Sequence, residues 1–418
     1  MRGTLAWARA VSSVAWHWFR VAILEGGMVK KLTLQALPTP LSVPFLRATC
    51  RADIEDNELA ETQSADEENL DDGSRVGVKG VNGETSRLLV VSGKKPDETL
   101  RYIVKRPPPE GSKVREVAGL QRWPERECKF YTELAQFVPC KTPRCVLAER
   151  RDAIDFVLVL EELQPAEWFT HDDAQGLTFR QALAAVCAIG KVHAAFRSSP
   201  HLDKSWLPIL PVQLPLVPFL VSHLETVWPA VEKIHRDDIP EDIRAKVGAL
   251  ASQYEALSER LAAAPRTLVH GDFRAENMRF RIATPGLSSP TPNSISPSTL
   301  TPGDLAAGGE VEVAVFDWAM CSQGNGVYDF VYVLVLSLTR DTLRKHEQAL
   351  EDAYCHAAGI TNDAQLRELK QAALLIIFAS YIFGAVAGVE DESARPTHAI
   401  GFQRLCAAIE EWDAMRLL

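Results

Sequence analysis

The chain has 418 residues, of which 46% are hydrophobic and 24% are charged, and its formal net charge is −10. This composition indicates a globular protein long enough for two or three domains. It excludes a chain that is disordered or collagen-like throughout and a polytopic membrane protein. The acidic balance also argues against a general nucleic-acid binder, which needs a basic surface for the phosphate backbone.

The first 73 residues are predicted to form an extension that precedes the folded part of the chain. Residues 1–24 contain no acid and three arginines, which is typical of an organellar transit peptide. The alternatives for residues 1–27 are a disordered extension, a native helix, or an artefact of the gene model if Met28, which follows Gly26-Gly27, is the true start. Residues 52–72 contain ten acids and no base, and they predict a solvated linker or a polar helix within an extension over 28–73. Eight scattered cysteines without a C-x-x-C pair favour a reducing compartment. We expect a cytoplasmic protein, or a mitochondrial or plastid one if the N-terminal segment is a transit peptide.

Residues 74–160 predict a strand-rich region with one helix. Apolar runs on both sides of a turn at 80–83 predict two strands, 99–105 predicts a third, and the apolar run 156–163 predicts a buried one. Residues 124–137 predict a helix that begins with Pro124, because proline is favoured in the first helical turn.

From residue 161 onward the pattern is mainly helical. The segment 283–310 is rich in Ser, Thr, Pro and Gly and predicts a disordered insertion in a hairpin connection. The uncharged stretch Ala372–Val389 reaches the lower length limit of a membrane span, but it lacks a flanking basic cluster, so we expect a buried core helix and no membrane span. The remaining predicted helices are 178–196, 219–236 and 241–263, and the predicted short strands are 267–272, 278–282 and 311–318.

The clearest chemical signal is the segment HGDFRAEN at 270–277, followed by Phe316-Asp317-Trp318. Phosphoryl transfer needs a carboxylate at the acceptor hydroxyl and oxygen ligands that hold Mg²⁺ on the phosphates. Asp272 and Asn277 in one loop, with Asp317 at the end of a later strand, supply these groups in the order found in kinases. Lys105 at a strand end and Glu127 on the next helix supply the ion pair that holds the nucleotide phosphates. The chain contains no G-x4-G-K-[ST] motif, which excludes the P-loop class.

Five segments in order resemble the aminoglycoside phosphotransferase and choline kinase superfamily, and within it the ecdysteroid-kinase-like (CHK kinase-like) branch. The resemblance covers roughly residues 76–390. It implies an α+β, bilobal protein-kinase-like fold with a small antiparallel-sheet N-lobe over 74–160 and a large helical C-lobe over 161–418. It also implies ATP- and Mg²⁺-dependent transfer of phosphate to a hydroxyl group of a small molecule. The segments are YIVKRPPP, RECKFYTELA, FVLVLEEL, LVHGDFRAENMRF and VFDWAMCSQGNGVYDFVYVLVLSL.

The resemblance assigns roles by motif position. It implies that Asp272 is the catalytic base and that Asn277 and Asp317 bind Mg²⁺. His270 and Asp329 would brace the catalytic loop. The residues implied to bind the nucleotide are Lys105, Glu127, the phosphate-loop glycines Gly80 and Gly83, and the hinge residues Glu161 and Leu163.

Several alternatives stay open at this stage. Glu125 competes with Glu127 as the partner of Lys105, and the tryptophans at 206, 228 and 318 belong either to the core or to an acceptor pocket. Ala319 follows Asp-Trp where the branch commonly has a polar residue, and residues 80–86 do not form a G-x-G-x-x-G loop. An inactive or weakly active nucleotide-binding regulatory relative is the alternative function. The sequence defines neither the acceptor nor the oligomeric state.

Overall fold

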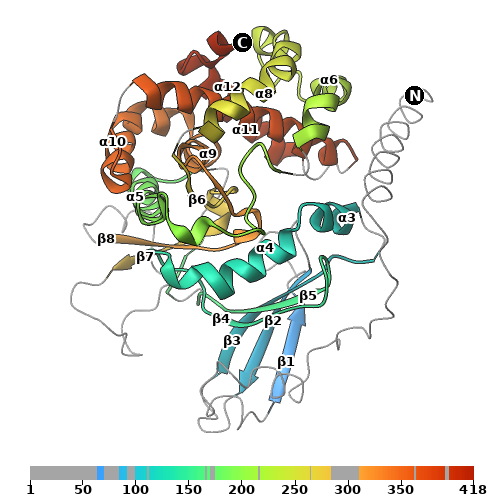
Figure 1. Cartoon of the computed structure of the whole chain (residues 1–418), viewed down its shortest axis with the longest axis vertical. Coiled ribbons are helices and arrows are strands. Elements are labelled where there is room, and N and C mark those ends of the chain that lie inside the picture. The colour runs from blue at the N-terminus through green and yellow to red at the C-terminus, as the bar shows by residue number, and fades with distance from the viewer. Residues whose placement is uncertain are drawn as a thin grey trace. The chain divides into compact units, whose positions relative to one another are not determined.

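The computed structural model contains helices and antiparallel sheets, which confirms the α+β class (Figure 1). The predicted transit peptide, Gly80 and Gly83, and residues 284–309 of the predicted insertion lie outside the residues that the structure describes. The described residues are 64–69, 84–91, 99–110, 113–164, 167–169, 175–214, 217–263, 265–283, 310–361, 364–390 and 395–418.

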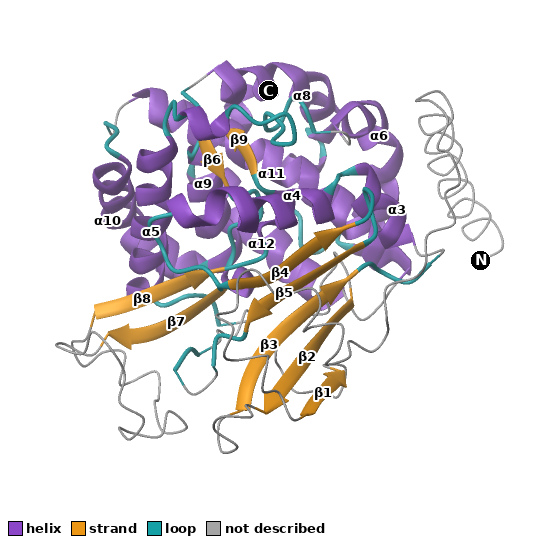
Figure 2. Cartoon of the chain, turned by 60° about the horizontal axis from the view of Figure 1, so that its bottom comes forward, coloured by secondary structure: helices purple, strands orange, loops and turns teal. Residues whose placement is uncertain are grey.

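A five-stranded antiparallel sheet has the order β1-β2-β3-β5-β4 (Figure 2). The strand β1 lies within the acidic stretch 52–72, so the expectation of a linker or polar helix is corrected for these six residues. Main-chain hydrogen bonds to β2 stabilise a strand of any sequence, and charges are common on edge strands because they prevent further pairing. The strands are β1 (Ser64–Asn69), β2 (Glu84–Val91), β3 (Thr99–Arg106), β4 (Cys145–Arg150) and β5 (Phe156–Glu161).

Two helices lie between β3 and β4 in the chain, α3 (Lys113–Leu120) and α4 (Trp123–Lys129). The predicted helix 124–137 is present, but it continues beyond α4 as a π turn over Phe130–Leu134 and a 3₁₀ turn over Ala135–Phe137. The helix α4 packs against β4 and also against the turn Trp318–Met320. It therefore connects the sheet to the loop that carries Asp317.

The remaining helices pack on one another, with α11 in contact with α6, α8, α9 and α12 (Figure 1). The predicted helix 241–263 is divided in two by residues 245–246. By length and composition α11 could cross a membrane, but 67% of its apolar window is buried within the protein, as expected for a core helix. The helices are α5 (Phe179–Phe196), α6 (Val217–Ile234), α7 (Glu241–Arg244), α8 (Val247–Ala263), α9 (Val327–Ser337), α10 (Arg340–Ala358), α11 (Ala364–Glu390) and α12 (Arg395–Glu411).

Two short strand pairs hold the motif-bearing loops. The strand β7 (Met278–Ala283) pairs with β8 (Glu310–Val315), and β6 (Thr267–Val269) pairs with β9 (Ser322–Gly324), a strand that the sequence does not predict. One loop connects β6 to β7 and the other connects β8 to β9. Because both ends of each loop are paired with the ends of the other, the loops of Asp272 and Asp317 are held next to each other.

Candidate active site

The loop between β6 and β7 brings Asp272 and Asn277 into direct contact. The Asn277 side-chain amide donates hydrogen bonds to the backbone oxygen and to Oδ2 of Asp272, both at 2.8 Å. The backbone oxygen of Asn277 accepts from the Phe316 N–H at 3.1 Å, which links this loop to the residue before Asp317. The structure thus brings together the three polar residues of the motif.

Asp329 and His270 brace this loop, as the resemblance implies. The fully buried Asp329 carboxylate accepts the backbone N–H of His270 at 2.7 Å and of Gly271 at 3.0 Å. The Nε2 atom of His270 lies 2.9 Å from the Phe316 carbonyl, and its Nδ1 accepts the Asp272 N–H at 3.2 Å. A neutral His270 with its proton on Nε2 satisfies both contacts.

Gly271 permits the close approach of the two loops. Its φ of 85° is a left-handed conformation, which glycine adopts readily, and a Cβ atom at this position would lie 2.4 Å from the Met320 carbonyl oxygen. A side chain here would therefore push the loop that carries Asp272 away from the loop that carries Asp317.

Lys105 lies between two carboxylates. Its Nζ is 2.6 Å from Glu127 Oε1 and 3.2 Å from Asp317 Oδ1, so β3, α4 and the loop after β8 meet at one cation. Burial opposes the charge on Lys105, but the charges of Asp317 and Glu127 hold its pKa above the ordinary value. Burial raises the pKa of Glu127 to about 7, with the Lys105 charge opposing this shift and the Asp317 charge adding to it.

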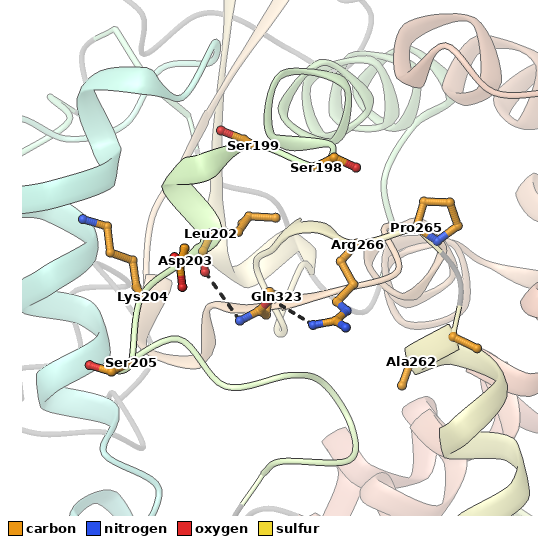
Figure 3. Close-up of a pocket in the computed structure, with 11 residues that line it drawn as sticks. Ser198, Ser199, Leu202, Asp203, Lys204, Ser205, Ala262, Pro265, Arg266 and Gln323 are labelled. Atoms are coloured by element: carbon orange, nitrogen blue, oxygen red, sulfur yellow. Dashed lines mark hydrogen bonds between the residues drawn. The ribbon is translucent and has the colours of Figure 1, made fainter.

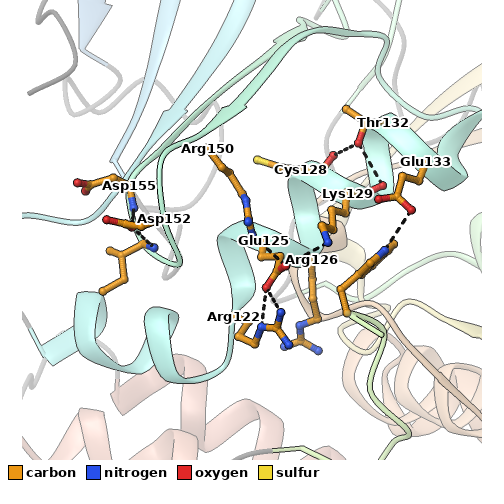
Figure 4. A network of polar contacts seen from close by, with 12 residues as sticks. Arg122, Glu125, Arg126, Cys128, Lys129, Thr132, Glu133, Arg150, Asp152 and Asp155 are labelled. Atoms are coloured by element: carbon orange, nitrogen blue, oxygen red, sulfur yellow. Dashed lines mark hydrogen bonds and ion pairs between the residues drawn. The ribbon is translucent and has the colours of Figure 1, made fainter. Parts of the chain in front are cut away.

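The structure shows which of the two candidate glutamates pairs with Lys105. Glu125 contacts three other bases, namely Arg122, Lys129 at 3.2 Å and Arg150 at 3.3 Å (Figure 4). Glu127 pairs with Lys105 instead. The ion pair near Asp317 therefore belongs to Glu127, and Glu125 fixes α4 to its surroundings.

Arg126, which the sequence analysis missed, ties α4 to the turn after Asp317. Only 2% of Arg126 is exposed, and its guanidinium donates to the carbonyls of Met320 and Cys321, both at 3.3 Å. Burial lowers its pKa to about 10. Since Glu127 is the next residue, this contact fixes the helix that presents the Lys105 partner. A buried arginine between two glutamates gives no periodic signal that distinguishes it from a surface charge.

The tryptophans form part of the core. Trp318 is fully buried, stacks on Phe130 with ring centroids 4.1 Å apart, and donates its Nε1–H to the Val315 carbonyl at 3.3 Å. Trp206 and Trp228 are also buried. Of the alternatives left open by the sequence, the structure favours core packing over an acceptor pocket for all three.

The oxygen atoms near Asp317 suit a magnesium ion. The side-chain NH₂ group of Asn277 donates to Asp272, and in the described part of the chain no donor hydrogen-bonds to the Oδ1 atom of Asn277. That oxygen and a carboxylate oxygen of Asp317 are hard donors of the kind that Mg²⁺ prefers, so these two residues fit a magnesium ion. Asp317 itself has φ 62° and ψ 58°, a strained backbone for a residue with a side chain, and such strain is concentrated at functional sites.

Of the predicted hinge residues, Glu161 is the last residue of β5 and Leu163 lies two residues beyond it. The Glu161 carboxylate pairs with Lys141 at 2.5 Å, and its amide donates to the Arg144 carbonyl at 2.9 Å. The Glu162 amide donates to the Arg101 carbonyl at 3.0 Å. These two amides are thus committed to the sheet, and Leu163 follows them outside the strand.

A cavity of about 910 Å³ lies away from this site (Figure 3). It adjoins the start of β6 at Arg266 and the β9 residue Gln323, whereas Asp272 follows the other end of β6. None of the predicted site residues is among those that line it. Its other lining residues are Ser198, Ser199, Leu202, Asp203, Lys204, Ser205, Ala262, Ala263 and Pro265.

The chain belongs to the phosphotransferase enzyme family, whose model matches residues 78–288, just over half of the sequence. The match includes Lys105, Glu127, Asp272 and Asn277, and Asp317 lies beyond it. The prediction of a small-molecule kinase, an enzyme that transfers phosphate to a hydroxyl, is confirmed at the level of this family. A comparison with curated proteins gives no match.

Solved structures similar to the chain include three kinases. The Plasmodium vivax ethanolamine kinase is 10% identical over 86% of this chain and 85% of its own, with a TM-score of 0.46. The GDP and kanamycin complex of APH(2")-IIia is 14% identical over 89% and 98%, with a TM-score of 0.47. A microcompartment-associated aminopropanol kinase is 13% identical over 88% and 96%, with a TM-score of 0.44.

Proposed function

We propose that the protein transfers the γ-phosphoryl group of ATP to a hydroxyl of a small molecule in the presence of Mg²⁺. The observation that carries this proposal is the meeting of Lys105, Glu127 and Asp317 beside the hydrogen-bonded pair Asp272 and Asn277. This set contains a cation for phosphate, oxygen ligands for a metal ion and a carboxylate for the acceptor. We further propose the bilobal arrangement and the CHK kinase-like branch for this chain.

Each residue of the set has a defined task in this proposal. Asp272 orients the acceptor hydroxyl and takes its proton as the new bond forms. Lys105 holds phosphate oxygens of the nucleotide, and Glu127 fixes Lys105 from α4. Asn277 and Asp317 would hold Mg²⁺, which supplies charge neutralisation for the phosphates when it is bound.

Contacts of the proposed nucleotide-binding residues support an assignment of the groups that would bind the nucleotide. The 3.2 Å contact between Lys105 and Asp317 is the one that phosphate oxygens would replace, because both side chains are then needed by the nucleotide. The amides of Glu161 and Glu162 already donate into the sheet, so we assign the adenine contact to the backbone of Leu163. The phosphate loop would contain Gly80 and Gly83.

We also propose a reducing, cytoplasm-like location. All seven cysteines in the described part of the chain are free thiols, and disulfides are rare in such compartments. We propose a single small molecule as the partner of the site, since the acidic chain does not suit nucleic acid.

The test is a transfer assay on the full chain with γ-labelled ATP, Mg²⁺ and a fractionated extract of small metabolites, with GTP in parallel. The variant Asp272→Asn removes the proposed base, and Asp237→Asn, an exposed acid in the turn after α6, is the matched control. We expect a labelled metabolite from the wild type and the control, and at least about 100-fold less from Asp272→Asn.

The other outcomes separate the alternatives. If Mg·ATP raises the melting temperature but no metabolite is labelled, the protein is a nucleotide-binding regulatory relative. If neither nucleotide changes the melting temperature, the proposed function is wrong.

A further inference from the structure

The cavity away from the active site is formed by three parts of the chain (Figure 3). One wall is the segment 198–205 after α5, another is the end of α8 with Pro265, and Arg266 and Gln323 complete it. Pockets that bind small molecules have volumes of about 300–1,000 Å³, so this cavity of about 910 Å³ is large enough for one. Because Arg266 directly precedes β6, a ligand bound here contacts the support of the catalytic loop.

The side chains that line the cavity are polar and carry more positive than negative charge. Lys204 and Arg266 are the bases, and Asp203 is the one acid among the described lining residues. Three serine hydroxyls and the Gln323 amide can both donate and accept hydrogen bonds. This set suits a ligand with a phosphate head and hydroxyl groups, because a guanidinium forms paired hydrogen bonds with phosphate and a carboxylate accepts from a hydroxyl.

Arg266 has hydrogen-bond donors available for such a ligand. Its Nη1 donates to Gln323 Oε1 at 3.4 Å, a long contact and the one side-chain hydrogen bond of Arg266 among the described residues. A guanidinium has five N–H groups, and the Arg266 side chain is exposed. Its backbone is fixed, since the Arg266 carbonyl accepts the Ser198 N–H at 3.2 Å. The remaining donors can therefore bind an anion without a rearrangement of the chain.

Lys204 is held by an ion pair that a ligand can replace. Its Nζ lies 3.0 Å from Glu133 Oε2, and the exposed fractions of the two side chains are 32% and 33%. Ion pairs of this kind contribute little to stability, because water screens the charges. In Figure 3, Lys204 and Arg266 lie on opposite sides of Gln323. A phosphate between the two cations would lie over the Gln323 amide.

Glu133 connects this cavity to the helix that presents Glu127. It lies in the π turn Phe130–Leu134, which continues α4 directly. The Oε2 atom of Glu133 accepts from the Lys204 ammonium and from the Trp206 Nε1–H at 3.2 Å. Two contacts from the segment that borders the cavity therefore hold the end of the helix whose earlier part contacts the active site.

We propose that this cavity is a regulatory site for a small organic phosphate that carries hydroxyl groups. The phosphate binds between Arg266 and Lys204, and the hydroxyl groups bind Asp203 and the serines. The regulatory effect rests on the proposed function, because it acts on nucleotide affinity, whereas the binding of the phosphate does not depend on that function.

The ligand acts on the active site by taking Lys204 from Glu133. Of the two contacts that hold the π turn through Glu133, the one from Trp206 then remains. The end of α4 is held less firmly, so Glu127 fixes Lys105 less well and the nucleotide binds more weakly. Coupling between two sites is reciprocal, so Mg·ADP weakens the binding of the phosphate by the same factor.

The experiment measures binding to the full chain by calorimetry. The probes are inorganic phosphate, glycerol 3-phosphate and glucose 6-phosphate, with glucose as the neutral control. The variants Arg266→Gln and Lys204→Gln each remove one cation, and Arg266→Lys keeps the charge without the fork. The matched control is Arg260→Gln, because Arg260 is an exposed arginine of α8 that does not line the cavity. The Kd of Mg·ADP is then measured with and without saturating phosphate ester, in the wild type and in Glu133→Gln.

We expect both phosphate esters to bind the wild type and Arg260→Gln, inorganic phosphate to bind more weakly, and glucose not to bind. Arg266→Gln and Lys204→Gln should each weaken the Kd of the esters at least about tenfold, the scale of one lost hydrogen bond between charged groups. Arg266→Lys should keep part of the affinity. The esters should weaken the Kd of Mg·ADP by about fivefold or more in the wild type and by less than about twofold in Glu133→Gln.

Three results would overturn the inference. Binding of none of the phosphates removes the site, and an unchanged Kd in Arg266→Gln places the phosphate elsewhere in the protein. A Kd of Mg·ADP that the esters leave unchanged overturns the regulatory role. A wild type that binds no Mg·ADP contradicts the proposed function itself, whereas the titrations with phosphate still test the cavity, so the two failures are distinguishable.

Discussion

The substitution Asp329→Asn tests how the catalytic loop is held. The buried Asp329 carboxylate accepts two backbone N–H groups, from His270 and Gly271, and His193 Nε2 lies 3.3 Å from Oδ2. Asparagine keeps one oxygen and places an NH₂ group where the other was. Losing one hydrogen bond to a charged acceptor costs about 1.5–3 kcal/mol, and a buried donor that faces another donor costs about 1–3 kcal/mol more. We therefore expect the free energy of unfolding to fall by about 2.5–6 kcal/mol.

The loss is measured by urea unfolding followed by tryptophan fluorescence, with Asp237→Asn as the control of equal charge change. The control should stay within about 0.5 kcal/mol of the wild type, because the side chain is exposed. Phosphate transfer by Asp329→Asn should also fall, since the loop that presents Asp272 would lose its anchor.

An Asp329→Asn protein within about 1 kcal/mol of the wild type would refute the reasoning, because that loss is smaller than the hydrogen bond alone. Full activity with reduced stability would refute only the link to catalysis, and would leave Asp329 as a purely structural residue.

Two further perturbations address the loop and the ion pair. Gly271→Ala should destabilise the protein by at least about 1–2 kcal/mol more than Gly359→Ala. Both glycines have positive φ, but only at Gly271 does a Cβ meet the Met320 carbonyl, so equal melting temperatures would contradict the clash. The pKa of the Glu127 carboxyl is about 7 in the folded protein, against its ordinary value of 4.5. Proton binding by Glu127 therefore stabilises the folded state fully below pH 4.5, and this stabilisation is lost as the pH rises to 7. We expect the difference in unfolding free energy between the wild type and Glu127→Gln to fall by up to about 3 kcal/mol from pH 4.5 to pH 7. A difference that does not change with pH would show that Lys105 keeps Glu127 ionised throughout this range.

Local patterns predict much of the fold, and they fail where distant contacts decide. The apolar run of β5 and the capped, amphipathic α5 are found where periodicity places them, because their side chains alone define a buried face. The strands β1 and β9 give no such pattern. The acidic β1 depends on the edge of β2, and the three-residue β9 depends on β6.

The candidate site divides in the same way. The spacing of Asp272 and Asn277 is a local property of one loop, and the sequence shows it. The resemblance already favours Glu127 over Glu125, and the structure adds the orientation of α4, which Arg126 fixes through the loop after Asp317. Arg274 lies within the motif, between Asp272 and Asn277, but only its geometry beside Asp272 distinguishes it from a surface arginine.

The left-handed backbone of Asp317 sets a limit on how this protein can be stabilised. Glycine adopts φ 62° without the strain of about 1–3 kcal/mol that a side chain brings there. Asp317→Gly would relieve this strain, but it would also leave the buried Lys105 with Glu127 as its carboxylate partner in the described part of the chain. A thermostability screen on this chain therefore needs a second selection for nucleotide binding, because a variant that gains backbone stability at position 317 loses a carboxylate of the site.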